Sequence, residues 1–133
     1  MQSNPYLFFN GDCEQALKFY EQTLGAKIDA VMKHGGSPSE KDVPPDWADK
    51  VMHARFSIGD SVLMASDAPP GHYQRPQGFS ISVSDNDKAK AESIFNALAE
   101  NGTTIMPFQQ TFWAAGFGMC IDRFGIPWMV NCE

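Results

Sequence analysis

The spacing of hydrophobic positions changes from strand-like to helical and back near the start of the chain. Residues 6–10 form a short run of mainly aromatic and aliphatic side chains, which is typical of a strand. Apolar residues then recur every three or four positions up to Gly25, and glycine commonly ends a helix. Asp12 and Gln15 resemble an N-capping pair at the start of this helix. Residues 26–34 are predicted to form a second strand.

Two segments rich in proline and glycine interrupt the middle of the chain. Residues 35–48 and 67–76 have the composition of loops. Between them, apolar and polar residues alternate over 51–58, and a Gly-Asp turn leads into a second run over 62–66. This pattern predicts a β-hairpin.

The second half of the chain repeats the same order of elements. Its predicted elements are a strand over 79–83, a helix over 86–101, a strand over 103–107 and a closing hairpin of 117–122 with 126–132. We predict an α+β fold in a single domain over 1–133, with module one at about 1–68 and module two at about 76–133. Each helix can cover one face of a sheet, so the uncovered faces must meet each other or a ligand.

Alternation also predicts which strand residues face away from the helices. In 51–58 the apolar residues at even-numbered positions, Met52 among them, should pack against the covering helix. The same argument in the last strand assigns Trp128 to the core. The predicted cavity on the opposite face is lined by Tyr6, Phe8, His53, Arg55, Ser57, Met64, Met129 and Asn131, with Trp113 at its mouth.

A mainly apolar cavity with a few polar groups is typical of small-molecule sites. His53 could act as a general base, and Arg55 could hold a carboxylate or a phosphate in a bidentate manner. Structural alternatives stay open for both residues, because His53 can simply line the pocket and Arg55 can pair with an acid. Met64 and Met129 can likewise be ordinary gap-fillers.

Composition narrows the class of partner. The 133 residues are 43% hydrophobic and carry a net charge of −6, with ten scattered basic residues, so neither nucleic acid nor an anionic membrane is an expected partner. No apolar run approaches the ~20 residues that span a bilayer, and no secretory signal is recognisable. Cys13, Cys120 and Cys132 are an odd number and form no disulfide framework. We expect reduced thiols in a cytoplasmic protein.

Several motifs resemble one known superfamily. They are Pro5-Tyr6-Leu7-Phe8-Phe9-Asn10-Gly11, Ala16-Leu17-Lys18-Phe19-Tyr20, Ile58-Gly59-Asp60, Thr111-Phe112-Trp113 and Asp122-Arg123-Phe124-Gly125-Ile126-Pro127-Trp128. Through them the chain resembles the PhnB-like branch of the vicinal-oxygen-chelate superfamily, which includes glyoxalases, bleomycin-resistance proteins and dioxygenases. The resemblance implies paired βαβββ modules that form a curved mixed sheet around a cavity, in a homodimer. Ala114, Ala115 and Gly116 depart from the branch, which often has a glycine and a charged residue after the tryptophan.

Metal enzymes of that superfamily chelate a divalent ion with His and Glu side chains. The resemblance places the corresponding positions at Asn4 or Pro5, Met64, Gly78 or Phe79, and Met129. None of these is a His or a Glu, and thioethers suit Cu(I) rather than the harder ions of this chemistry. His34, His53 and His72 are far apart in sequence. We therefore predict no metal site and no cofactor.

Two functions of different classes are compatible with these residues. The first is a metal-free small-molecule-binding protein of the glyoxalase/bleomycin-resistance type, with an unknown ligand and a second copy of the chain as partner. The alternative is a lyase, isomerase or dioxygenase that uses a rebuilt metal site or His53 as general base. Some relatives are described as ubiquinone-pathway methyltransferases, but no glycine-rich nucleotide loop follows the first predicted strand.

Overall fold

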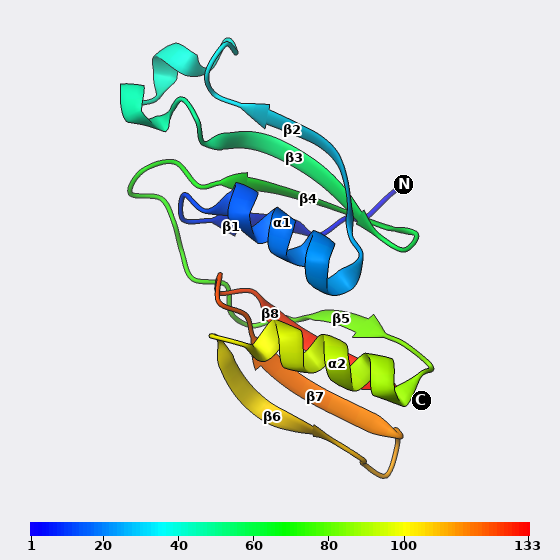
Figure 1. Ribbon diagram of the computed structural model, residues 1–133. Helices are drawn as coiled ribbons and strands as arrows, with labels where there is room; N and C mark the ends of the chain where they lie inside the picture. Colours follow the sequence, from blue (N-terminus) through cyan, green and yellow to red (C-terminus); the bar gives the residue numbers. More distant parts are fainter. The chain divides into compact units, whose positions relative to one another are not determined.

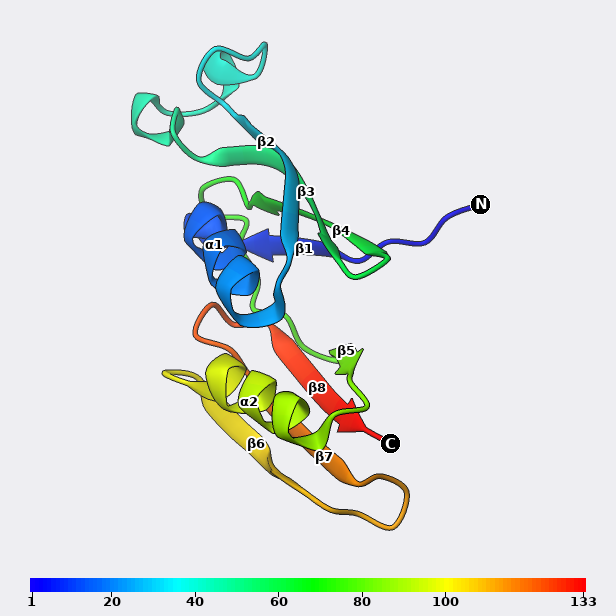
Figure 2. The same ribbon diagram turned by 45° about the vertical axis from the view of Figure 1, so that its right-hand side comes forward.

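Two units with the same order of elements make up the chain, Met1–Gln74 and Arg75–Glu133. The computed structural model describes residues 1–133. Each unit is a four-stranded mixed sheet with one helix across one face (Figure 1), and the view from a second side shows the same layering within each unit (Figure 2). The predicted α+β fold with a repeated strand-helix-strand-strand-strand order is confirmed.

The first sheet has the strand order β1-β4-β3-β2. Its strands are β1 (Tyr6–Phe9), β2 (Lys27–Lys33), β3 (Val51–Ile58) and β4 (Ser61–Asp67). β1 runs parallel to β4, and the other neighbours are antiparallel. Helix α1 (Cys13–Leu24) connects β1 to β2 and ends at Gly25, whose φ of 67° is the left-handed conformation that glycine adopts without strain.

The core of the first unit lies between α1 and this sheet. Tyr20 of α1 is fully buried and stacks on Phe56 of β3, with ring centroids 6.1 Å apart. Met52 was predicted to belong to this core, but it is half-buried, and the neighbouring Val51 is buried instead. The register shifts between Met32 and Lys33 on the adjacent strand β2, and such a bulge interrupts simple alternation.

A buried carboxylate at the end of β4 holds the start of α1. Asp12 is the N-cap residue, but its side chain accepts no capping hydrogen bond, so the predicted Asp12–Gln15 capping pair is wrong. Asp67, at the end of β4, accepts the hydrogen bond at the start of α1 instead. Its Oδ1 accepts a hydrogen bond from the Cys13 N–H at 2.9 Å, and its Oδ2 accepts one from the Val51 N–H at 2.9 Å. One side chain therefore fixes the beginning of α1 and of β3 to the end of β4.

The long connection between β2 and β3 contains two single-turn 3₁₀ helices, η1 (Glu40–Asp42) and η2 (Pro45–Trp47). Lys50 closes it against the start of α1, since its ammonium donates to the Gly11 carbonyl at 2.9 Å and lies 5.8 Å from the Trp47 ring centroid.

The second sheet has the matching order β5-β8-β7-β6. Its strands are β5 (Ile81–Ser84), β6 (Thr103–Gln109), β7 (Gly116–Ile121) and β8 (Pro127–Cys132). β5 runs parallel to β8, and β7 is antiparallel to both of its neighbours. Helix α2 (Lys88–Ala99) packs against β7 and β8. Phe79, predicted as part of the first strand of this half, precedes β5.

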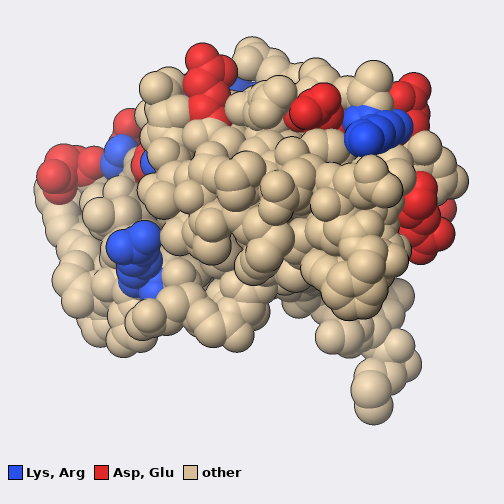
Figure 3. All heavy atoms as spheres, turned by 90° about the horizontal axis from the view of Figure 1, so that it is seen from below, with Lys and Arg blue, Asp and Glu red and all other residues tan.

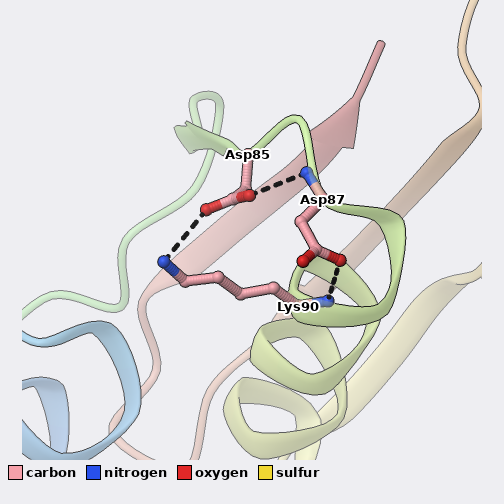
Figure 4. Close-up of polar contacts among 3 residues, drawn as sticks. All are labelled: Asp85, Asp87 and Lys90. Atoms are coloured by element: carbon pink, nitrogen blue, oxygen red, sulfur yellow. Dashed lines mark hydrogen bonds and ion pairs between the residues drawn. The ribbon is translucent and has the colours of Figure 1, made fainter.

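Three polar residues define where α2 begins (Figure 4). The Asp87 carboxylate accepts the Lys90 amide at 3.1 Å and caps the helix. Asp85 accepts the Asp87 amide at 2.8 Å and pairs with the Lys90 ammonium at 3.3 Å. The hydrogen bond from the Asp87 amide, followed by the contact with Lys90, lowers the pKa of Asp85 below its ordinary value.

The turn between β7 and β8 is built around a second buried carboxylate. Oδ1 of Asp122 accepts the amides of Phe124 at 2.8 Å and Ile126 at 3.1 Å, and Oδ2 accepts the Trp128 indole N–H at 2.8 Å. Trp128 is fully buried, which confirms its assignment to the core.

Candidate functional site

Six of the nine predicted ligand-binding residues lie on the open face of the first sheet, opposite α1. They are Tyr6, Phe8, His53, Arg55, Ser57 and Met64. Register places Tyr6 beside Met64 and Met64 beside Arg55, so these three form one row across β1, β4 and β3. The intervening residues of β1 and β4 are buried on the α1 side, so the predicted alternation is confirmed for these strands.

The rings of Tyr6, Phe8 and His53 form a connected surface, named here the aromatic platform. Tyr6 and Phe8 have ring centroids 5.0 Å apart, and Tyr6 and His53 have centroids 5.7 Å apart. The Tyr6 hydroxyl and Nδ1 of His53 share a hydrogen bond of 3.0 Å, in which the tautomer of the ring decides the donor. Tyr6 is 36% exposed and Phe8 51% exposed. Two large aromatic side chains are thus held in place with their faces accessible.

Arg55 is exposed beside the aromatic platform and makes no hydrogen bond or ion pair in the structure. Asp29 on the neighbouring strand β2 has another partner, because Ser57 Oγ donates to Asp29 Oδ2 at 2.9 Å. The sequence left open whether Arg55 pairs with an acid of the chain. The structure gives no such pair, so the guanidinium keeps its donors for another partner.

The other three predicted site residues belong to the second unit. Met129 and Asn131 are half-buried on the face of the second sheet opposite α2, whereas Trp128 and Val130, which alternate with them along β8, are buried on the α2 side. The alternation predicted for this strand is therefore confirmed.

Trp113 lies in the loop before β7. Its ring meets Phe117 edge-on at a centroid distance of 5.5 Å, and Phe117 pairs with Asn131 on the open face. Phe112 in turn packs edge-on to Trp113 at 4.8 Å and is 97% exposed. Trp113 thus stands at the Asn131 end of the open face of the second sheet.

A cavity of about 480 Å³ lies toward the other end of the second sheet. It is lined by Arg75, Pro76, Gln77, Gly78, Phe79, Ser80, Ile105, Ile121, Pro127 and Met129. Met129 is the one residue of the predicted set that lines it. The walls are mainly apolar, and Arg75 is the one charged side chain among them.

Sequence reasoning missed most of the residues of this cavity. Arg75 to Ser80 form the segment before β5, and its first part, Arg75 to Gly78, has no strand pattern. Ile105 is 55% exposed and lies where the register of β6 shifts between Thr104 and Met106, so simple alternation fails there. The signal that the sequence offered was the alternation that placed Met129 on the open face. In the structure β5 pairs with β8, which brings Ser82 beside Met129.

The residues at the expected metal-ligand positions do not fit a divalent ion. The Asn4 amide donates to the Val62 carbonyl at 3.1 Å, and Met64 and Met129 offer only thioethers. Phe79 lines the apolar cavity. No group of three or more His, Cys, Asp or Glu side chains is placed to hold a metal ion.

All three cysteines are buried free thiols. Burial, helped by the nearby Asp67 carboxylate, raises the pKa of the Cys13 thiol far above its ordinary value. Burial also raises the pKa of Cys120 to about 11, with a smaller contribution from Asp122. Neither thiol is activated as a nucleophile, because nucleophilic cysteines have a lowered pKa.

Charged side chains of both signs are interspersed on the surface rather than gathered by sign (Figure 3). Most of the face visible there carries neither an acidic nor a basic side chain.

No helix of the chain is long and apolar enough to cross a membrane.

Comparisons with known proteins agree with this geometry. The family model described as 3-demethylubiquinone-9 3-methyltransferase matches residues 2–131. Protein YjdN from Escherichia coli (strain K12) is 37% identical over 141 residues, which cover 98% of this chain and 95% of that protein. The crystal structure of protein PA1353 from Pseudomonas aeruginosa shares 51% identity and a TM-score of 0.90, covering 100% of this chain and 98% of that one.

Two more distant structures show the fold alone. The PhnB protein from Bacillus cereus has a TM-score of 0.85 at 20% identity, with 100% of both chains covered. A glyoxylase/bleomycin resistance protein/dioxygenase domain from Frankia sp. EAN1pec has a TM-score of 0.66 at 15% identity, covering 100% of this chain and 97% of that one.

Proposed function

This chain belongs to the 3-demethylubiquinone-9 3-methyltransferase family, the PhnB-like branch of the vicinal-oxygen-chelate superfamily, and we propose that it binds a small organic molecule. The observation that carries the proposal is the cavity of about 480 Å³ on the second unit. Ligand sites commonly have volumes of roughly 300–1,000 Å³, apolar walls and a few polar groups. Arg75, Gln77 and Ser80 supply the polar groups here, and Phe79, Ile105 and Met129 supply apolar wall.

Methyl transfer, which the family description names, has no support in this chain. Enzymes that bind nucleotide cofactors in α/β folds use a glycine-rich turn after the first strand of a parallel, doubly wound sheet. The corresponding turn here is Asn10-Gly11-Asp12, and both sheets are mixed. Binding without group transfer is the simpler function for these residues.

The residues of the first unit support a second candidate, an isomerase or lyase in which His53 is the general base. The hydrogen bond between Nδ1 and the Tyr6 hydroxyl orients the imidazole and leaves Nε2 without a partner in the structure. A base oriented in this way can accept a proton from a ligand within hydrogen-bond reach. This candidate predicts turnover that disappears in His53→Gln, whereas the binding protein needs no turnover.

We further propose that the protein works without a metal, in the cytoplasm, and as a homodimer. The soft donors at the expected ligand positions and the buried free thiols support the first two statements. Light scattering after size exclusion tests the dimer, and a mass of one chain, 14.7 kDa, would contradict it.

The cavity is tested with the neutral fluorescent probe N-phenyl-1-naphthylamine. We expect wild-type protein to enhance its emission, and a panel of small organic molecules to compete with it. Ile105→Glu places a charge on the cavity wall at a half-exposed position, so it should lose the probe without unfolding.

Val31→Glu is the matched control, because it makes the same type of change on the exposed edge strand of the first unit, where the side chain is 36% exposed. Probe binding that is equal in wild type, Ile105→Glu and Val31→Glu would contradict the cavity as the binding site. Melting temperatures of the three proteins exclude unfolding as the cause of a loss.

A further inference from the structure

The first unit carries an unpaired cation next to exposed rings, and the cavity of the second unit does not involve it. Arg55 lies on β3 between His53 and Ser57, and Met64 on β4 is its register partner. On the other side, β2 places Ala30 beside it. These neighbours leave the guanidinium without a competing carboxylate along its own row of the sheet.

Asp29 of β2 and Glu14 of α1 each have a partner of their own. Asp29 accepts the Ser57 hydroxyl, and Glu14 pairs with Lys33 at 3.4 Å. Arg55 therefore retains a planar set of donors that matches a carboxylate in a bidentate arrangement.

The aromatic platform beside Arg55 is preorganised. The rings of Tyr6 and Phe8 are inclined at 33°, and those of Tyr6 and His53 at 38°. The hydrogen bond between Tyr6 and His53 ties two of the three rings together, so little side-chain freedom remains to be lost when a flat molecule contacts them.

We propose that Arg55 and the aromatic platform form a recognition site for a planar aromatic or conjugated carboxylate. The carboxylate binds the guanidinium, and the apolar body of the ligand lies over Tyr6, Phe8 and Met64. Tyr6 and Arg55 lie two strands apart in one row, roughly 10 Å between backbones, a span that a bicyclic aromatic acid covers.

The single positive charge of this site favours a carboxylate over a phosphate as the bound anion. A phosphate monoester carries nearly two negative charges near neutral pH, and strong phosphate sites use several donors or cations. Arg55 is the one Lys or Arg side chain of β1, β3 and β4, and the lysines of β2, Lys27 and Lys33, pair in register with Ser57 and Val51 rather than with the Arg55 row. A single guanidinium matches a single carboxylate.

The test compares 2-naphthoate with its neutral analogue 2-naphthamide by isothermal titration calorimetry. We expect wild type to bind naphthoate roughly tenfold or more tightly than naphthamide, the size of effect that a charge-assisted hydrogen bond gives. Arg55→Gln should abolish this preference. Arg123→Gln, an exposed arginine of the second unit that lies 3.9 Å from Glu100, is the matched control and should keep it.

A second variant tests the aromatic platform. Tyr6→Leu should weaken both ligands by a similar factor and leave their ratio unchanged, and its melting temperature should stay close to that of wild type because Tyr6 is exposed. A changed ratio with unchanged affinity for naphthamide would overturn the assigned role of the rings.

Two results would overturn the site as a whole: no binding of naphthoate by wild type at millimolar concentration, or a preference for naphthoate that survives in Arg55→Gln. A preference that disappears in Arg75→Gln instead would move the anion site to the cavity and also overturn the proposal. Binding of N-phenyl-1-naphthylamine by Arg55→Gln should remain intact, so failure of this site and failure of the proposed function are distinguishable.

Discussion

Asp122→Asn tests how the closing turn of the second unit is held. The carboxylate accepts three N–H groups, from Phe124 and Ile126 at Oδ1 and from the Trp128 indole at Oδ2, and the residue is only 3% exposed. Asparagine keeps the shape but has one acceptor oxygen and an amide nitrogen that can only donate. In either orientation of the amide, at least one buried N–H faces another donor.

The magnitude follows from this loss of acceptors. A buried donor left unsatisfied costs about 1–3 kcal/mol, and the remaining hydrogen bonds lose their charge assistance. We therefore expect Asp122→Asn to lower the free energy of unfolding by about 2–4 kcal/mol, a large part of the 5–15 kcal/mol typical of a domain. The melting temperature should fall by roughly 8–16 °C.

Urea denaturation followed by far-UV circular dichroism measures this change. Asp85→Asn is the matched control, because Asp85 is a less buried carboxylate that accepts one amide and pairs with Lys90, and it should cost clearly less than Asp122→Asn. A double-mutant cycle with Trp128→Phe isolates the indole hydrogen bond and should give a coupling of about 1–2 kcal/mol. If Asp122→Asn costs no more than Asp85→Asn, the carboxylate does not anchor the turn and the reasoning is refuted.

Three further changes probe the rest of the fold and the proposed absence of a metal. Gly118→Ala should lower the free energy of unfolding by about 1–3 kcal/mol in urea titrations, because the added Cβ would lie 2.6 Å from Phe95 Cε1; a neutral effect would contradict this close approach. Between pH 9 and 11 the free energy of unfolding should fall by about 2 kcal/mol more in wild type than in Cys120→Ala, because the pKa of the thiol is about 11 when folded against an ordinary 9.0, so the unfolded thiol ionises first; parallel pH curves would count against it. Incubation with Ni, Zn, Mn or Fe(II) should leave the melting temperature unchanged and bind no stoichiometric metal by elemental analysis, whereas a stabilising stoichiometric metal would revive the metal-dependent alternative.

Periodicity was enough to predict the elements because each helix and strand buries one regular face. The helix ending before Gly25 and the hairpin after residue 51 follow from side-chain spacing alone. Periodicity fails where a long-range contact replaces a local one. Asp12 has the local sequence of a cap, but the Asp67 carboxylate, far away in sequence, accepts the amide at the start of the helix.

The candidate site was predictable only where the strands are regular. Tyr6, Met64 and Arg55 lie in one row because β1, β4 and β3 pair without a shift in register there. The cavity of the second unit depends on an irregular segment before β5 and on a shift in β6, and neither has a periodic signature. The unpaired state of Arg55 was also beyond sequence reasoning, since it depends on which acids other side chains bind.

The two units use one architecture with different chemistry on their open faces. In each unit a buried carboxylate, Asp67 or Asp122, holds N–H groups at a strand or helix end on the side of the core. The residues of the open faces, by contrast, contribute few hydrogen bonds to the fold, the pair of Tyr6 and His53 being an exception. Substitutions on the open faces should therefore alter ligand binding at little cost in stability, whereas substitutions at the two carboxylates should alter stability first. Arg55→Gln and Asp122→Asn, measured side by side for both properties, separate the two roles.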